Sequence, residues 1–495
     1  MRSGVLFLPF FLVEVVPHSY CTFVSLLIFQ EDLKYLIAGT DVFYSLFCGA
    51  AIFLMQCGFA MLCAGSVRQK NVKNILLKNL LDACGGALGF YTIGFGVAYE
   101  GGSFIGTTGG RFFLNDATDY GYIEFFFQFT FAATAATIVA GTVAERCKMV
   151  AYLCYSLFLT AFVYPVVVHA IWNSAGFLSA FADSPVRGVG MIDFAGSGVV
   201  HMTGGFTALI AAVVLGPRIG RFYDEDGNPL DKPHSFPPHS VALQVLGTFI
   251  LWFGWYGFNP GSTLAISPEG YGDIAALCAV TTTLSAATGA VFSLFTDTLL
   301  GFLSEGEAEY DLTMAMNGAL GGLVGITANC SVVEPWAAVL IGAVSGVVYV
   351  FSSKLLIMLK IDDAVDAIPV HFFNGIWGCI ATGLFAAPRH VALAYSSTAA
   401  ENCGLFYTNG NLLVNEILGV GFILLWVGGT MTPFFFALNM LGMFRVDPLE
   451  EKVGLDMSHH KGAAYDLTGP DKEDVDILAE KRATAHGKEG FSEDA

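Results

Sequence analysis

The sequence predicts an all-α polytopic membrane protein with about eleven transmembrane helices. Of the 495 residues, 55% are hydrophobic and only 13% are charged, against roughly 25% charged residues in an ordinary soluble protein. The 57 glycines and 44 phenylalanines fit helices packed in lipid, where glycine lets backbones approach closely. Apolar runs of about twenty residues recur along the chain, the length that a helix needs to cross about 30 Å of hydrocarbon.

Eleven apolar stretches are long enough to be spanning helices. A β-barrel would instead show alternating segments of about ten residues, and the sequence has none of these. In chain order the stretches are 42–63, 80–99, 124–144, 149–169, 199–216, 240–258, 273–296, 312–330, 336–356, 368–387 and 413–443.

Lysine and arginine indicate which loops face the cytoplasm, because short cytoplasmic loops retain them. The interleaved loops hold only Arg111, Arg187 and Arg389. Loop 297–311 is acidic and holds no basic residue, but acidic residues contribute little to this rule. We therefore expect the N-terminus outside and, after an odd number of spans, the C-terminus in the cytoplasm. The basic, cytoplasmic loops are 64–79, the turn near 145, 217–239, and 357–367 with its flank.

Both ends of the chain differ from the membrane domain that we expect over residues 41–445. Residues 1–40 are predicted to be an extracellular N-terminal segment. The apolar run 5–16 follows Arg2 and is typical of a signal-peptide core, with a loose extracellular segment or a misassigned start codon as alternatives. Residues 446–495 are polar and acidic and are predicted to be a cytoplasmic regulatory tail, too short for an enzymatic domain.

Two histidines stand out because an ionisable side chain in hydrocarbon costs about 2.5–3.5 kcal/mol on the insertion scale. His201 and His371 each follow an aspartate, Asp193 or Asp363, by eight residues, and each opens the pattern H-x-x-[GN]-G. With about five spans in each half, an odd number, the second copy must be inverted in the membrane. The sequence thus predicts a five-plus-five inverted repeat plus a C-terminal helix, with the two histidines meeting near the midplane. A third histidine, His169, ends a span and is interpreted as interfacial.

Such a histidine pair can share a proton between ring nitrogens, which suits the passage of a small hydrogen-bonding species. Aromatic residues suggest an entrance to this path: Phe127 and Phe131 lie one helical turn apart, and another span ends with Phe258 and Ser262. Phenylalanines at this spacing are more often lipid-facing or core residues than a gate. Trp172 is likewise more often a residue of the interfacial aromatic belt, although tryptophan is the best cation–π partner.

Several motifs carry a family resemblance. They are QCGFAMLCAGSVRQKN (56–71), GTVAER (141–146), DFAGSGVVHMTGG (193–205), GPRIGRF (216–222), LWFGWYGFNPGS (251–262) and DDAVDAIPVHFFNGIWG (362–378). With them the chain resembles the ammonium transporter family (Amt/Mep/Rh), closest to its plant-like eukaryotic branch, from about residue 41 to about residue 465. The resemblance implies the eleven-helix inverted-repeat fold, assembled as a homotrimer with a pore through each subunit.

Carried over residue by residue, the resemblance implies an outer vestibule, a gate and a pore. The vestibule residues are Trp172, Ser262, Phe127, Phe131 and Asp193, with Trp172 and Ser262 receiving ammonium and Asp193 orienting nearby dipoles rather than binding the cation. The gate is the pair Phe131 and Phe258, the pore contains His201 and His371, and Asp363 is the repeat partner of Asp193.

Two departures affect this comparison. Phe372, Phe373 and Asn374 follow the second histidine where many members have small residues, which is expected to reshape the lower pore. In the tail, Ser458 occupies the place of a hydroxyl residue whose phosphorylation closes plant relatives, but His459 follows where those relatives commonly have arginine.

The sequence therefore predicts high-affinity ammonium uptake: recruitment outside, deprotonation at the phenylalanine gate, and conduction of ammonia past the histidines, with or without separate proton transfer. The alternatives are an electroneutral Rh-like channel for ammonia or carbon dioxide, and an ammonium sensor that signals through its tail. An enzyme is not expected, and no CxxC or His/Cys ligand spacing suggests a metal or cofactor. Expected partners are ammonium, ammonia, methylammonium as an analogue, and a regulator or kinase at the tail, with no nucleic acid; the expected location is the plasma membrane.

Overall fold

The structure is a computed structural model that describes residues 18–115, 119–460 and 462–465. In this part of the chain, ten helical segments are long and apolar enough to cross a membrane, and the only β-pairing is in isolated bridges. The predicted class, an all-α polytopic membrane protein, is confirmed. The eleventh predicted span corresponds to α11 (Leu312–Thr327), which has only 16 residues and is buried throughout from Met316 onward. Neighbouring helices rather than lipid therefore cover most of α11.

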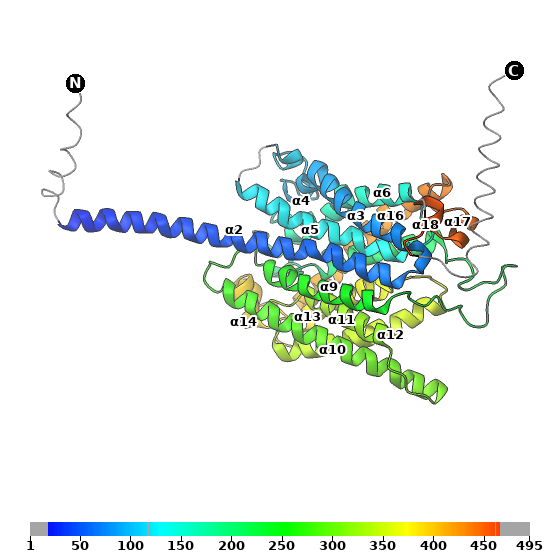
Figure 1. Ribbon diagram of the computed structural model, residues 1–495. Coiled ribbons are helices and arrows are strands. Elements are labelled where there is room, and N and C mark those ends of the chain that lie inside the picture. Colours follow the sequence, from blue (N-terminus) through cyan, green and yellow to red (C-terminus); the bar gives the residue numbers. More distant parts are fainter. Residues whose placement is uncertain (1–17, 116–118, 461, 466–495) are drawn as a thin grey trace, which may run out of the picture.

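The helices run back and forth through one bundle (Figure 1). Four segments contain π-helical turns, namely η2 (Phe90–Gly94), η4 (Leu159–Val163), η6 (Ser197–Met202) and η7 (Ile368–Phe373). Besides α11, the α-helices of the described residues are α2 (His18–Ser66), α3 (Val72–Gly89), α4 (Phe95–Tyr99), α5 (Asp119–Thr142), α6 (Met149–Phe158), α7 (Tyr164–Trp172), α8 (Thr203–Leu215), α9 (Val241–Gly261), α10 (Tyr271–Glu305), α12 (Pro335–Met358), α13 (Asn374–Phe385), α14 (Pro388–Ala394), α15 (Ser397–Ala400), α16 (Asn411–Met440), α17 (Pro448–Val453) and α18 (Leu455–His459). Three short 3₁₀ helices are η1 (Gln69–Asn71), η3 (Phe112–Leu114) and η5 (Val186–Gly188).

Helix α2 is longer than the predicted first span and extends beyond the bundle (Figure 1). Its apolar part, Phe29–Ser66, has 38 residues and measures about 57 Å, nearly twice the thickness of the hydrocarbon. No proline interrupts residues 18–66, so nothing in the sequence ends the helix at residue 41. Residues 18–40 are thus part of this helix, and side chains 29–40 are all exposed. The run 5–16, predicted as a signal-peptide core, lies outside the described residues.

Glycine allows α2 and α9 to pack with almost no space between their backbones. A Cβ atom on Gly247 would lie 2.4 Å from the backbone nitrogen of Leu62, and one on Gly257 would lie 2.7 Å from the carbonyl oxygen of Cys48. Real Cβ atoms do not approach so closely, so only glycine fits at these two positions. This contact explains part of the high glycine content, since packing in lipid depends on close backbone approach.

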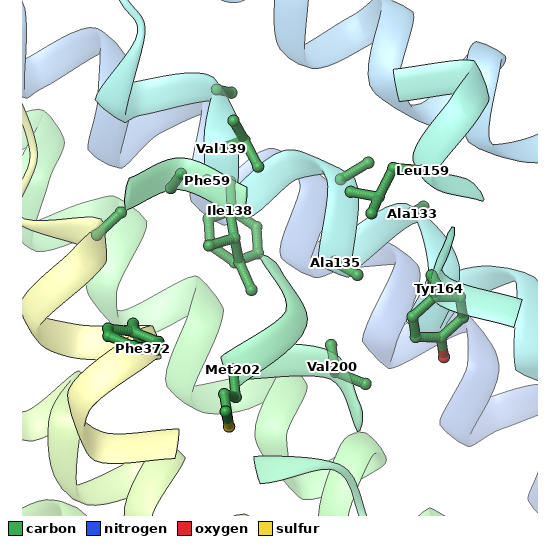
Figure 2. Close-up of a cluster of buried hydrophobic side chains, with 14 of the residues drawn as sticks. Phe59, Ala133, Ala135, Ile138, Val139, Leu159, Tyr164, Val200, Met202 and Phe372 are labelled. Atoms are coloured by element: carbon green, nitrogen blue, oxygen red, sulfur yellow. The ribbon is translucent and has the colours of Figure 1, made fainter. Parts of the chain in front are cut away.

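The centre of the bundle is a continuous apolar core in which the two halves of the chain meet. Figure 2 shows Phe59 of α2, Ile138 of α5, Met202 of η6 and Phe372 of η7 in this core. The segments η6 and η7 therefore meet at the centre of the protein, although they are far apart in the sequence. Their placement decides where the two histidines lie.

A layer of buried charges closes the cytoplasmic end predicted from the sequence. Arg218 donates to both oxygens of Asp362, at 2.8 and 2.9 Å, and to Glu145 at 2.9 Å. Burial alone raises the pKa of Asp362, but the guanidinium groups of Arg146 and Arg218 outweigh it and hold this pKa well below its ordinary value. The guanidinium of Arg218 thus lies between the carboxylates of Asp362 and Glu145. A buried charge needs an oppositely charged partner and hydrogen bonds, and Arg218 has both.

The first part of the tail docks against this layer. Glu451 of α17 is buried, and its carboxylate accepts the backbone N–H of Ile219 at 2.7 Å. Asp456 of α18 is also buried, and it accepts the N–H groups of Lys73 and Asn74 at 3.0 and 2.9 Å, at the start of α3. The tail therefore binds orphan donors at a helix N-terminus. Residues 466–495 lie outside the described part of the chain.

Candidate functional site

The first predicted histidine lies in the π-helical turn η6, which an aspartate organises. Asp193 is buried, and its carboxylate accepts the N–H groups of Gly196, Gly198 and Val199 at 3.0, 3.0 and 2.7 Å. Gly196 has a φ of 105°, a left-handed conformation that favours glycine. This turn places His201, which has no exposed surface, inside the bundle.

The second histidine has an equivalent support. The carboxylate of Asp363 accepts the N–H groups of Val365 and Ile368 at 3.3 and 2.7 Å, and His371 follows in η7. In both copies the aspartate binds the N–H five residues later, and the histidine comes eight residues later. The repeated spacing in the sequence thus corresponds to a repeated local structure.

The two histidine side chains meet, as the repeat predicts. The Nδ1 atoms of His201 and His371 are 3.2 Å apart, and the ring planes are within 18° of parallel. At this distance one neutral imidazole donates Nδ1–H and the other accepts it. The Nε2 atom of His201 is buried without a hydrogen-bond partner among the described residues. The pair therefore offers an unused polar atom in an otherwise apolar lining.

Aromatic rings continue from the histidine pair toward the predicted outer side. The ring of Phe258 lies 5.5 Å from that of His201 and 4.1 Å from that of Phe131, measured between centroids. Phe131 in turn contacts Phe127 at 5.1 Å and Trp172 at 5.8 Å, the latter edge to face. Phe131 and Phe258 are both almost fully buried, and Phe258 lies between Phe131 and His201.

An outer cavity of about 100 Å³ lies directly above these rings. Its lining includes Trp172, Ser262, Phe127 and Phe131, four of the five residues predicted for the vestibule. The hydroxyl of Ser262 donates to the carbonyl of Phe258 at 2.8 Å, so its oxygen can accept a donor from the cavity.

The fifth predicted vestibule residue, Asp193, is not part of this lining. Its carbonyl oxygen accepts the indole N–H of Trp172 at 2.7 Å, while its carboxylate holds the backbone of η6. Asp193 thus positions Trp172 from behind. This arrangement agrees with a carboxylate that orients dipoles without binding the cation.

Two cavities follow the histidine pair at the other end of the bundle. A small one of about 20 Å³ is lined by His371, Phe59 and Asn317, and a larger one of about 330 Å³ contains Asp363 and Asp366 in its lining. Asn317 lines both cavities, so they are neighbours. The rings of Phe131, Phe258, His201 and His371 form a stack, which we call the ring stack. It separates the outer cavity, near the start of α5, from the two cavities near the end of α5.

Two interpretations from the sequence need revision. Phe372 and Phe373 do not line the small cavity below His371; Phe372 stacks on Phe206 of α8 at 5.0 Å. His169 is fully buried rather than interfacial, with its ring nitrogens 3.0 and 2.8 Å from the carbonyl oxygens of Ala98 and Gly102.

Sequence reasoning missed several residues that surround this path. Trp255 is fully buried and stacks on His201 at 5.2 Å, and Phe59 lies 6.1 Å from His371. Tyr99, Glu124 and Gln128 line the outer cavity. Gln128 and Glu124 are visible in the sequence as polar residues in an otherwise apolar helix, α5. The interpretation of this helix used only the spacing of its phenylalanines and therefore did not include them.

Together, the spanning helices and the ring-lined path between two cavities define a polytopic membrane protein of the transporter or channel class. Comparison with known proteins identifies the family. The chain belongs to the ammonium transporter family, because the model described as Ammonium Transporter Family matches residues 43–465. Membership of this family supports ammonium transport across a membrane.

Relatives and solved structures agree with this assignment. Ammonium transporter 1 member 3 of Solanum lycopersicum is 43% identical over 86% of this chain and 93% of its own length. Ammonium transporter Amt2 of Archaeoglobus fulgidus is also 43% identical, over 86% of this chain and 88% of its own length. Among solved structures, a protein described as Sensor Amt Protein matches with a TM-score of 0.74 and 32% identity, covering 86% of this chain and all of that chain. Candida albicans Mep2 matches with a TM-score of 0.71 and 26% identity, covering 85% and 89%.

Proposed function

We propose that the protein mediates high-affinity uptake of ammonium by binding the cation in the outer cavity and conducting ammonia past the histidine pair. The observation that carries this proposal is the stack of rings between the cavities, in which His201 and His371 place their Nδ1 atoms 3.2 Å apart. Ammonium and potassium have the same charge and similar size. Selection between them must therefore use what only ammonium has, N–H donors and a proton that it can give up.

The outer cavity suits binding of a small cation. The face of Trp172 and the rings of Phe127 and Phe131 attract a cation by their quadrupoles, worth about 2 kcal/mol or more when water is excluded. The oxygen of Ser262 can accept one N–H of the bound ion. Potassium has no N–H group to donate to this oxygen, so a directed hydrogen bond here favours ammonium.

Deprotonation follows from the cost of moving a charge past Phe131 and Phe258. An unpaired ion in such an apolar passage loses its hydration, which is very costly, whereas neutral ammonia is not excluded in this way. Beyond the gate, His201 and His371 can accept or donate one hydrogen bond at a time. The proton either remains outside or follows along the paired imidazoles, and in the second case the membrane potential drives uptake by about 2.3 kcal/mol per charge per 100 mV.

A second candidate function is ammonium sensing, because one solved structure that the chain resembles is described as a sensor. The docked tail supports this candidate, since Asp456 binds the start of α3 and could report a movement there. An electroneutral Rh-like channel for ammonia or carbon dioxide is less favoured, because Trp172 and Ser262 line a cavity suited to a cation.

The proposal includes assembly and location. We place the protein in the plasma membrane as a homotrimer, with the N-terminus outside and the tail in the cytoplasm, where a regulator or kinase has access to it. The basic loops predicted to be cytoplasmic, including Arg218, lie at the same end of the bundle as the docked tail. The outer cavity lies at the opposite end.

Uptake and current in a cell that lacks its own ammonium transporters test the proposal. Trp172→Ala should weaken apparent affinity, and His201→Ala combined with His371→Ala should abolish growth on low ammonium. The matched controls are Trp336→Ala, at a tryptophan that is 56% exposed, and His390→Ala, remote from the path; both should behave like wild type. Unchanged growth after replacement of both pore histidines would refute the role proposed for them. Methylammonium current that is independent of voltage would exclude the electrogenic version.

A further inference from the structure

The outer cavity is lined by oxygen-bearing side chains that the recruitment site described above does not use. These are Tyr99, Glu124 and Gln128. Glu124, Gln128 and Phe131 occupy positions i, i+4 and i+7 of α5, so one face of this helix presents two acceptors followed by a gate ring. The acceptors therefore stand one and two turns ahead of the gate.

Two of these oxygens have no partner in the described part of the chain. Gln128 is only 8% exposed, and its Oε1 atom forms no hydrogen bond there; the hydroxyl oxygen of Tyr99 is buried and unpaired in the same way. A buried acceptor without a donor destabilises a folded protein, because it has lost its bond to water and gained none in return. Both residues line the same cavity, so a small donor that enters the cavity is the nearest group that would satisfy these oxygens.

The third group, Glu124, adds negative charge. Its side chain is 20% exposed, and its Oε2 accepts Nη2–H of Arg111 at 2.8 Å. The backbone N–H of Arg111 also donates to a carboxylate oxygen of Glu100 at 2.7 Å. Among the described residues of this cluster, the two carboxylates of Glu100 and Glu124 outnumber the single guanidinium of Arg111. Arg111 thus holds the Glu124 carboxylate in place without cancelling the charge of the cluster.

We propose that Glu124, Gln128 and Tyr99 form an entry subsite that attracts a small ammonium cation and accepts its N–H groups before it reaches the ring of Phe131. The inference rests on the proposed recruitment of ammonium in this cavity. Its ligands are ammonium itself and small primary ammonium ions such as methylammonium. The carboxylate raises the local concentration of cations, and the two neutral oxygens replace part of the lost hydration.

The test measures the uptake of methylammonium by the full-length protein as a function of methylammonium concentration. It is done at about 10 mM and at about 150 mM ionic strength, because charges are screened over about 30 Å at the first and about 8 Å at the second. Glu124→Gln keeps the shape and removes the charge. We expect it to raise KM about threefold to tenfold at low ionic strength, to leave the maximal rate within about twofold, and to weaken the dependence of KM on salt. Arg111→Gln should lower KM, because it removes the opposing charge.

Glu334→Gln is the matched control, because Glu334 also pairs with an arginine, Arg389, but does not line the cavity. The amount of protein at the cell surface is measured for every variant. If Glu124→Gln shows the KM and salt dependence of wild type and of Glu334→Gln, the subsite is refuted; a fall in maximal rate alone, with an unchanged salt dependence, refutes it as well. Trp172→Ala in the same series separates the two proposals. If Trp172→Ala leaves KM unchanged, recruitment of ammonium in this cavity is overturned. If Trp172→Ala raises KM but Glu124→Gln does not, only the entry subsite is overturned.

Discussion

Replacing Asp193 by asparagine should destabilise the protein more than the same replacement at Asp363, its repeat partner. The carboxylate of Asp193 accepts three backbone N–H groups, two of them on Oδ2. In Asp193→Asn the amide oxygen can keep the two bonds of Oδ2. The amide NH₂ then faces the N–H of Gly196, so that donor loses its acceptor.

The magnitude follows from these bonds. A hydrogen bond to a charged group is worth about 1.5–3 kcal/mol, and a neutral one about 1 kcal/mol. Loss of one bond and weakening of two others therefore costs Asp193→Asn about 3–4 kcal/mol. Asp363 accepts one short bond, from Ile368 at 2.7 Å, and one long bond, from Val365 at 3.3 Å. Asp363→Asn retains the short one, and we expect a cost of about 1–2 kcal/mol.

The assay is the apparent melting temperature of the detergent-solubilised protein, followed by loss of soluble protein on heating. The expected order is wild type, then Asp363→Asn, then Asp193→Asn, with Asp193→Ala below all three. Equal melting temperatures for wild type and Asp193→Asn, or a lower value for Asp363→Asn than for Asp193→Asn, would refute the reasoning from hydrogen-bond counts.

Two further predictions concern the end of the bundle that the sequence predicts to be cytoplasmic. Ser458 is 4% exposed and its hydroxyl donates to the carbonyl of Gly454, so Ser458→Asp should place a charge in the buried part of the docked tail. We expect it to reduce uptake more than about tenfold at equal surface amounts, with Ser458→Ala as the control; full activity of Ser458→Asp would contradict the phosphorylation switch. Burial raises the pKa of Asp363 to about 7, with Asp366 adding to the rise, so the folded protein binds this proton more tightly than the unfolded chain. Stability from this group is then complete below about pH 4 and is lost as pH rises to about 7. The apparent melting temperature should fall over this range, and Asp363→Asn should flatten the fall; an unchanged slope would disprove the assignment.

Much of the fold could be predicted because membrane helices leave a strong trace in the sequence. Length and hydropathy indicated the spans, and the repeated aspartate and histidine spacing indicated that His201 and His371 would meet. What hydropathy could not show is how each helix is covered. Helix α11 has 16 residues because its neighbours surround it, and α2 continues past the predicted boundary because no residue stops it.

The local geometry of the site was less predictable. Nothing in the sequence marks η6 and η7 as π-helical, because the turn depends on which N–H groups the aspartates bind. The stacking of Trp255 on His201 depends on the placement of α9 against η6, a contact between residues distant in the chain. The acceptors Glu124 and Gln128 became visible as a group only when the cavity around them was known.

The ring stack also determines how membrane voltage acts on the protein. Phe131 lines the outer cavity and His371 lines the small inner cavity, and three ring contacts of 4.1, 5.5 and 5.2 Å between centroids connect them. This path is shorter than the hydrocarbon thickness of about 30 Å. If water fills the cavities on both sides, each holds a nearly uniform potential, and most of the electric field then falls across these few rings. A proton passing only from the gate to His371 would experience most of the transmembrane voltage, whereas a cation resting in the outer cavity would experience little of it.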